Sequence, residues 1–272
     1  MKETIGKQQT RTDLLDPARA AALHASLGLE GAAPLTLLPF WHYLYFWDAA
    51  PADRLGRDGH PKTGRFLPDM GLPRRMWAGG SLAFLHAPLL GEPAMRISTI
   101  TNAEQKSGRS GPLALVTLGH ELLQNGQLCV RETQDLIYRP DPDPSATAPI
   151  SPMARRDEST CQPVRFSPTL LFRYSALTFN GHRIHYDRDY CKSVEGYPGL
   201  VVHGPLLAQL LIHLAMRELG GLSQFSFRAT APLYDFEAAE LCARPDGDKL
   251  SLWVRGPDGR QCMTASAIYL AN

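Results

Sequence analysis

Imidazole, amide and carboxylate side chains gather in the segment Asn180–Asp187, which contains His182 and His185. An imidazole changes its charge near neutral pH and can move protons, while an amide can hold a water molecule by hydrogen bonds. Further along the chain, Gly204-Pro205 opens an apolar run. A helix that begins there would present free backbone N–H groups and its positive end. Together these groups could transfer a proton and stabilise a developing negative oxygen.

The same segment has the spacing His182-x-x-His185-x-Asp187, which could bind a metal because imidazole and carboxylate suit zinc or iron. No partner cluster of His or Cys is obvious in the sequence, although His203 could converge on the segment in the fold. We therefore predict no metal site. We favour acid–base chemistry by a histidine placed in a loop before a buried helix.

Two other kinds of motif are absent or incomplete in the sequence. A nucleophilic serine would need a sharp turn of the G-x-S-x-G kind, and the chain contains none. The segment Lys106–Gly111 lacks the Gly-Lys-Ser/Thr ending of a phosphate loop. Its Lys106, Arg109 and backbone N–H groups could still hold a phosphate, and an ordinary solvated basic turn explains the segment equally well.

The composition is that of a globular protein, with 272 residues, 44% hydrophobic and 20% charged, and a formal net charge of +1. Such a balance gives no sign of a nucleic-acid partner. The five cysteines are widely spaced without a C-x-x-C pair, which favours reduced thiols and a cytoplasmic location. The apolar stretch Leu206–Met216 is shorter than the roughly 20 residues that span a bilayer, so no membrane partner is expected.

Helices and one dense aromatic run are predicted in the first part of the chain. The segment Asp16–Leu27 has an Asp N-cap, proline at the first helical position and many alanines. The run Pro39–Trp47 reads as a buried strand or helix, or as the wall of an acyl pocket. A loop is expected at Leu55–Phe66. A helix could begin after Pro73, but the pair Gly79-Gly80 would weaken it.

From Ala94 onward, β-branched and alternating residues predict an antiparallel meander with a hairpin at Asn125-Gly126. The polar segment 140–165 is rich in proline, cannot form a packed element and marks a domain boundary. Ser167-Pro168 then starts a short helix, and Gly204–Leu219 predicts a helix that is apolar on nearly every face and therefore buried.

Four strand-like runs follow this helix: Ser223–Ala231, Ala238–Ala243, Lys249–Arg255 and Gln261–Leu270. A sheet of these strands could wrap around the helix and cover most of its surface. The chain therefore reads as an N-terminal unit over 1–139, a linker over 140–165 and a C-terminal unit over 166–272.

The segment Phe179–His185 resembles the signature of the MaoC-like, R-specific enoyl-CoA hydratases, roughly Gly-Asp-x-Asn-Pro-hydrophobic-His. Ile184 and His185 match its end, whereas Asn180 stands where that family has a catalytic Asp. The version found here looks like the type 2 hydroxyacyl-thioester dehydratases and the bacterial mesaconyl-C4-CoA or itaconyl-CoA hydratases. Further stretches typical of that branch are Leu55–Pro61, Leu72–Gly80, Lys106–Gly111 and Gln134–Arg139.

The resemblance implies an α+β double hot dog fold, in which each unit wraps an antiparallel sheet around a helix and the first unit is degenerate. It also implies a hydro-lyase that adds water across the double bond of an α,β-unsaturated acyl-CoA. In that reaction His185 would be the principal acid–base group and Asn180 would orient the water. The backbone N–H of Gly204 would donate to the thioester oxygen. Asp187 is a reserve carboxylate, because an amide at position 180 cannot take a proton.

Basic residues should line the entry for CoA phosphates, and an arginine suits the free carboxylate of a dicarboxylic acyl group. The substrate-binding candidates are Arg74, Arg75, Lys106, Arg109, Arg183 and His203. Apart from CoA in the substrate no cofactor is expected, and the resemblance implies a homo-oligomer.

Three alternatives remain open: a (3R)-hydroxyacyl-thioester dehydratase of fatty-acid synthesis acting on a carrier protein, a thioesterase, and a non-catalytic acyl-thioester binding protein.

Overall fold

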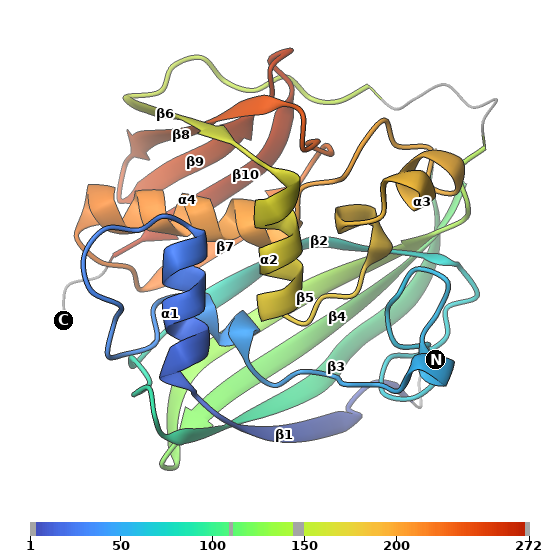
Figure 1. Ribbon diagram of the computed structural model, residues 1–272, viewed down its shortest axis with the longest axis horizontal. Coiled ribbons are helices and arrows are strands. Elements are labelled where there is room, and N and C mark those ends of the chain that lie inside the picture. The colour runs from blue at the N-terminus through green and yellow to red at the C-terminus, as the bar shows by residue number, and fades with distance from the viewer. Residues whose placement is uncertain (1–3, 109–110, 144–149, 270–272) are drawn as a thin grey trace. The chain divides into compact units, whose positions relative to one another are not determined.

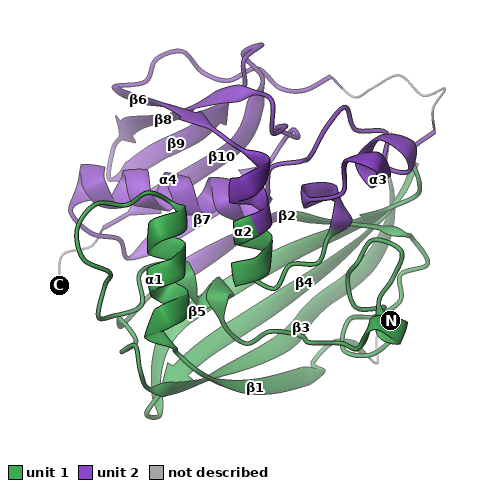
Figure 2. Cartoon of the chain, viewed as in Figure 1, with its two compact units in different colours: residues 1–77, 84–141, 173–182 green, residues 78–83, 142–172, 183–272 purple. Residues whose placement is uncertain are grey.

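The computed structural model describes residues 4–108, 111–143 and 150–269 (Figure 1). Two compact units make up the chain, and Figure 2 shows them in different colours. Unit 1 contains Met1–Trp77, Phe84–Asp141 and Arg173–His182, and unit 2 contains Ala78–Ala83, Pro142–Phe172 and Arg183–Asn272. Segments of the two units alternate along the sequence. The linker expected at 140–165 between two sequential units stays a prediction.

Unit 1 is built on long antiparallel strands in the order β1-β3-β4-β5 (Figure 1). Their bounds are β1 Gln8–Leu14, β3 Pro93–Gly108, β4 Gly111–Gln124 and β5 Gln127–Arg139. Asn125 and Gly126 both have positive φ, 51° and 79°, as the tight turn between β4 and β5 requires. The predicted meander and its hairpin are therefore confirmed, whereas β1 was not predicted.

Helical and aromatic segments complete unit 1. Helix α1 spans Pro17–Ser26, and the Asp16 carboxylate caps it by accepting from the N–H of Ala18, which confirms the predicted cap. The aromatic run forms a short 3-10 helix, η2, over Trp41–Leu44. Trp41, His42 and Leu44 are buried, and the Glu132 carboxylate on β5 accepts hydrogen bonds from His42 and Tyr43.

Unit 2 contains the long helix α4, Gly204–Leu219, and an antiparallel sheet in the order β7-β10-β9-β8-β6 (Figure 1). The strands are β6 Thr160–Arg165, β7 Gln224–Ala229, β8 Ala238–Asp246, β9 Lys249–Arg255 and β10 Gln261–Ile268. Helix α4 contacts β7 to β10 and ends at Gly220, whose φ of 73° makes it a left-handed cap. The predicted buried helix and the four strands after it are confirmed.

The helix suggested after Pro73 was wrong, because Arg74–Phe84 is strand β2. Within unit 2, Gly79 to Ala83 pair with β7, and Gly79 lies opposite Arg228. A Cβ at Gly79 would stand 2.7 Å from the Phe227 carbonyl oxygen. The glycines that weaken a helix therefore allow two strands to approach closely here.

The segment 140–165 was expected to form no packed element, yet its end is strand β6. This strand pairs with β8 alone, so it lies at an edge of the sheet of unit 2. Pro163 is compatible with that place because an edge strand leaves one row of backbone groups without a ladder partner.

The remaining helical segments are short. They are η3 Ala52–Arg54, α2 Pro168–Leu177, η4 Arg183–His185 and α3 Arg188–Ser193. Ser167 caps α2, as predicted, by accepting from the N–H of Leu170 at 3.1 Å. Over the residues described, no helix is long and apolar enough to cross a membrane.

Candidate active site

His185 lies in η4 and is buried, with 6% of its surface exposed. Its Nδ1 lies 2.7 Å from the carbonyl oxygen of Val201. A carbonyl can only accept, so Nδ1 carries the proton and donates it to this bond. In the neutral imidazole the Nε2 atom is then unprotonated, which is the form that a general base needs.

Val201 holds this loop at a second point. Its N–H donates to the carbonyl oxygen of Ile184 at 2.9 Å. The backbone of one residue therefore fixes both the path of the chain before His185 and the orientation of the imidazole.

His203 packs on the same imidazole. The two rings stack with centroids 3.6 Å apart and planes 19° apart, and His203 is fully buried. Burial, together with the positive charge that His185 can carry, lowers the pKa of His203 well below its ordinary value. His203 therefore stays neutral, and the pair carries at most one positive charge near neutral pH.

Helix α4 begins immediately after His203, with Gly204 and Pro205 as its first residues. Its first hydrogen bond runs from the N–H of Leu207 to the carbonyl oxygen of His203 at 3.1 Å. Helix geometry leaves the N–H of Gly204 without an acceptor inside the helix and concentrates positive potential there. A helix start of this kind can stabilise an oxyanion.

Asp187 and Arg183 bind each other. Asp187 caps α3 by accepting from the N–H of Tyr190 at 2.9 Å, and its other oxygen pairs with the Arg183 guanidinium at 2.7 Å. These contacts, the helix cap first, lower the pKa of the carboxyl. The structure therefore gives Asp187 a role in shaping the loop, and much of the hydrogen-bonding capacity of Arg183 is already used.

Asn180 belongs to unit 1, where it follows the end of α2. Its Oδ1 accepts from the N–H of His182 at 3.0 Å, and its own N–H donates to the carbonyl oxygen of Ser175 at 2.8 Å. A Cβ at Gly181 would stand 2.6 Å from the Gly59 carbonyl oxygen, so glycine is needed where these two loops meet.

The remaining basic candidates are spread over separate places. Arg74 and Arg75 open β2. Burial raises the pKa of Tyr138 although Arg75 lies beside it, while His60, and to a smaller extent Arg75, lower the pKa of Asp58 against the effect of burial. Lys106 pairs with Glu104 at 2.7 Å on β3. Arg109 lies outside the described residues.

Among the residues that the structure describes, two clusters have the residue types of a metal site. The ligand atoms of Asp58, His60 and His182 lie within 4.8 Å of one another in unit 1. However, the Asp58 carboxylate already accepts from His60 Nδ1 at 3.2 Å, and the positive charge of Arg75 beside it opposes a cation. We assign no metal to this cluster.

The second cluster is Glu158, Cys161 and Cys242 in unit 2. The Arg255 guanidinium binds Glu158 at 2.6 Å. Burial raises the pKa of both thiols, which disfavours the thiolate that a metal requires. Neither cluster therefore supports a metal site.

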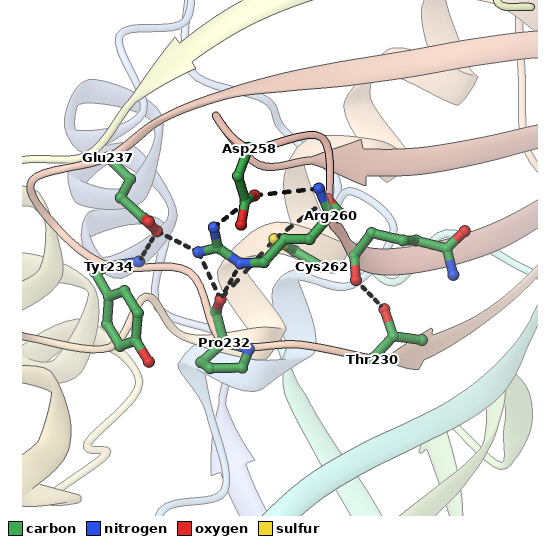
Figure 3. A network of polar contacts seen from close by, with 8 residues as sticks. Thr230, Pro232, Tyr234, Glu237, Asp258, Arg260 and Cys262 are labelled. Atoms are coloured by element: carbon green, nitrogen blue, oxygen red, sulfur yellow. Dashed lines mark hydrogen bonds and ion pairs between the residues drawn. The ribbon is translucent and has the colours of Figure 1, made fainter. Parts of the chain in front are cut away.

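A turn that the sequence did not single out supports the residues around His185. Within the segment Pro232–Glu237, the N–H of Tyr234 donates to the Glu237 carboxylate at 3.0 Å (Figure 3). Arg260 reaches into the turn, donating to the Pro232 carbonyl oxygen at 3.0 and 3.2 Å and pairing with Glu237 and Asp258. Figure 3 shows the guanidinium between these acceptors.

Comparisons with known proteins agree on one group of relatives. The sequence profile of the family described as hydroxyacyl-thioester dehydratase type 2 matches residues 40–235. A protein of Chloroflexus aurantiacus named mesaconyl-C(4)-CoA hydratase is 46% identical over 272 residues, which cover 96% of this chain and 95% of that protein.

Two solved structures share the architecture. A MaoC-like dehydratase from Phytophthora capsici aligns with a TM-score of 0.70 at 11% identity, covering 98% of this chain and 96% of that one. A Mycobacterium tuberculosis protein described as having a double hotdog fold aligns with a TM-score of 0.57 at 16% identity, covering 97% and 95%. The predicted α+β double hot dog fold is thereby confirmed.

Proposed function

This chain belongs to the hydroxyacyl-thioester dehydratase type 2 family, as its sequence resemblance predicted, and from that premise we propose that it hydrates a short dicarboxylic α,β-unsaturated acyl-CoA. Membership makes the protein a hydro-lyase. The proposed substrate is mesaconyl-C4-CoA or itaconyl-CoA, and the 46% identity to the Chloroflexus hydratase supports the first of these.

The observation that carries the proposed mechanism is the hydrogen bond from His185 Nδ1 to Val201. With Nδ1 protonated, Nε2 can take a proton from water while the water oxygen bonds to the β-carbon. The electron pair of the double bond moves toward the thioester and leaves negative charge on its oxygen. The N–H of Gly204 donates to that oxygen, an interaction whose removal typically costs about 3–4 kcal/mol. The imidazolium then returns a proton to the α-carbon.

Asn180 is proposed to orient the water, and the basic candidates to bind the CoA phosphates and the free carboxylate of the acyl group. Arg183 is the proposed partner of the free carboxylate, and its guanidinium would share that task with the contact it already makes to Asp187. We further propose a homo-oligomer in the cytoplasm that needs no cofactor beyond the CoA of its substrate.

The test is direct turnover of crotonyl-CoA, itaconyl-CoA and mesaconyl-C4-CoA, with products separated by chromatography and identified by mass spectrometry. We expect a water adduct from one dicarboxylic thioester, and a loss of about 100- to 10,000-fold in the variant His185→Ala, the contribution of a general acid–base. Glu158→Gln, a change at a charged residue paired with Arg255 elsewhere in unit 2, should keep the activity.

Each other outcome replaces the proposal with a specific alternative. Hydration of crotonyl-CoA alone would indicate a dehydratase of fatty-acid synthesis. Release of free CoA without a water adduct would indicate a thioesterase. Tight binding without turnover, unchanged by His185→Ala, would indicate a binding protein.

A further inference from the structure

The orientation of His185 depends on the backbone of Val201, so whatever fixes Val201 also fixes the imidazole. The segment Leu200–Val202 pairs with Leu233–Asp235 along a short ladder in unit 2. Val202 donates to the carbonyl oxygen of Leu233 at 2.8 Å, and Val201 and Tyr234 form an isolated β-bridge. This ladder carries no side chain that the sequence marks as functional.

Asp235 closes the ladder with both its backbone and its side chain. Its N–H donates to the carbonyl oxygen of Leu200 at 3.0 Å, and its Oδ1 accepts from the N–H of Leu200 at 2.9 Å. The carboxylate is only 4% exposed, and Arg188 on α3 donates to its Oδ2 at 2.6 Å. A buried, charge-assisted arrangement of this kind holds its partners in one geometry.

Gly199 shows how tightly the carboxylate is seated. A Cβ at this position would stand 2.9 Å from Asp235 Oδ1 and 2.7 Å from the ring of Phe236. No other residue type would leave the carboxylate room to reach the N–H of Leu200 without a shift. The glycine at position 199 therefore leaves the space that the Asp235 carboxylate occupies.

The far side of the ladder is anchored by Arg260. This guanidinium binds the Pro232 carbonyl oxygen and the Glu237 carboxylate, and Glu237 in turn accepts from the N–H of Tyr234 (Figure 3). The side chains of Arg260 and Glu237 are each 12% exposed. Tyr234, the partner of Val201 in the ladder, is thus held from the side opposite to Val201.

We propose that Asp235 is a positioning residue for His185, acting through Leu200 and Val201 with Arg260 as the second anchor. This inference rests on the proposed role of His185 as the acid–base group. The Asp235 carboxylate binds the N–H of Leu200 and the Arg188 guanidinium, so its proposed effect on the imidazole passes through the backbone. It holds the carbonyl of Val201 where that carbonyl can accept from Nδ1, and so keeps Nε2 available as the base.

Three variants test the contributions of the Asp235 side chain and of Arg260 to this role. Asp235→Ala removes the acceptor of the Leu200 N–H, and we expect kcat to fall about 10- to 100-fold with little change in KM, since small misplacements of a catalytic group cost that much. Asp235→Asn keeps Oδ1 as an acceptor, and the 42% exposed Arg188 can turn to water, so we expect kcat within about threefold of the native value. Arg260→Lys is a milder perturbation of the second anchor, and its kcat should lie between those two.

The direct readout is the tautomer of His185. In protein labelled with ¹⁵N-histidine, NMR distinguishes an imidazole protonated at Nδ1 from one protonated at Nε2, and the resonances missing in His185→Gln assign the residue. We expect Nδ1–H in the native protein and in Asp235→Asn, and a mixture of both tautomers in Asp235→Ala. The control is Glu158→Gln, which perturbs the ion pair of Glu158 with Arg255, another part of unit 2.

The idea fails if Asp235→Ala keeps both kcat and the Nδ1–H tautomer while losing only thermal stability, since that is a purely structural role. It also fails if Glu158→Gln lowers kcat as much as Asp235→Ala does. If the native protein hydrates none of the substrates, the proposed function fails instead. The NMR comparison still tests the positioning in that case, because it needs no turnover.

Discussion

At the scale of single residues, Asn180 offers other molecules a more defined group than its residue type suggests. Its Oδ1 is already bonded to the N–H of His182, so the group it offers to other molecules is chiefly its Nδ2–H₂. A water held by that donor is bound through its oxygen and keeps its own protons available to a base. The proposed role of Asn180, orienting the attacking water, would use this donor.

This role predicts different results for two substitutions at Asn180. Asn180→Ala removes both the turn and the donor, so kcat should fall about 10- to 100-fold and the protein should lose some stability. Asn180→Asp keeps an acceptor for the N–H of His182 but offers no donor when ionised. We therefore expect a similar fall in kcat with stability close to native.

Steady-state kinetics and chemical denaturation of both variants check these expectations. A rise in activity for Asn180→Asp would show instead that position 180 works best as a second base.

The sequence made His185 a candidate because its place before a buried helix and its match to the family signature are local features. It did not identify Asp235 or Arg260. A single aspartate in a turn carries no signal by itself, and Asp235 reaches Leu200 across 35 positions of sequence. Pairing at that distance is decided by tertiary structure and not by residue spacing.

At the scale of elements, α4 and the β4–β5 hairpin were predicted correctly from short sequence patterns. Helix α4 has proline in its first turn, apolar residues all round and a glycine cap, and the hairpin has Asn-Gly between alternating strands. Strands β1 and β6 were missed because they are polar or contain proline. They form only because β3 and β8 offer partners.

Strand β2 was not predicted because the sequence cannot show what its glycines face. Gly79→Ala should destabilise the protein by about 1–3 kcal/mol, since the added Cβ would meet the Phe227 carbonyl oxygen at 2.7 Å.

Urea unfolding measures the difference for Gly79→Ala, with Ser81→Ala as the control. Ser81 is exposed on the same strand and should change stability by less than about 0.5 kcal/mol. Equal stability of the two variants would mean that β2 and β7 approach less closely than described.

At the scale of the whole molecule, each compact unit includes a segment from the other half of the sequence. Residues 78–83 of β2 belong to unit 2, and residues 173–182 of the second half belong to unit 1. The predicted division at 140–165 follows the sequence order, which cannot show such an arrangement.

Because unit 2 includes residues 78–83, we expect that the fragment 142–272 does not fold alone. In this fragment β7 would lose its partner β2. Circular dichroism should show no cooperative urea transition for the fragment, and mixing it with the fragment 1–141 should restore one. A cooperative transition of native stability in the isolated fragment would contradict this reading of the units.

The five cysteines should allow the folded protein to be labelled at a single site. All five are free thiols, and Cys161 is exposed while the other four are buried. Burial raises the pKa of Cys242 and of Cys262 to about 12, so these thiols stay protonated and shielded. Cys161 lies opposite Cys242 in the pairing of β6 with β8. A maleimide dye should therefore label one site per chain in the folded protein. Labelling of a second site would indicate that β6 has separated from β8.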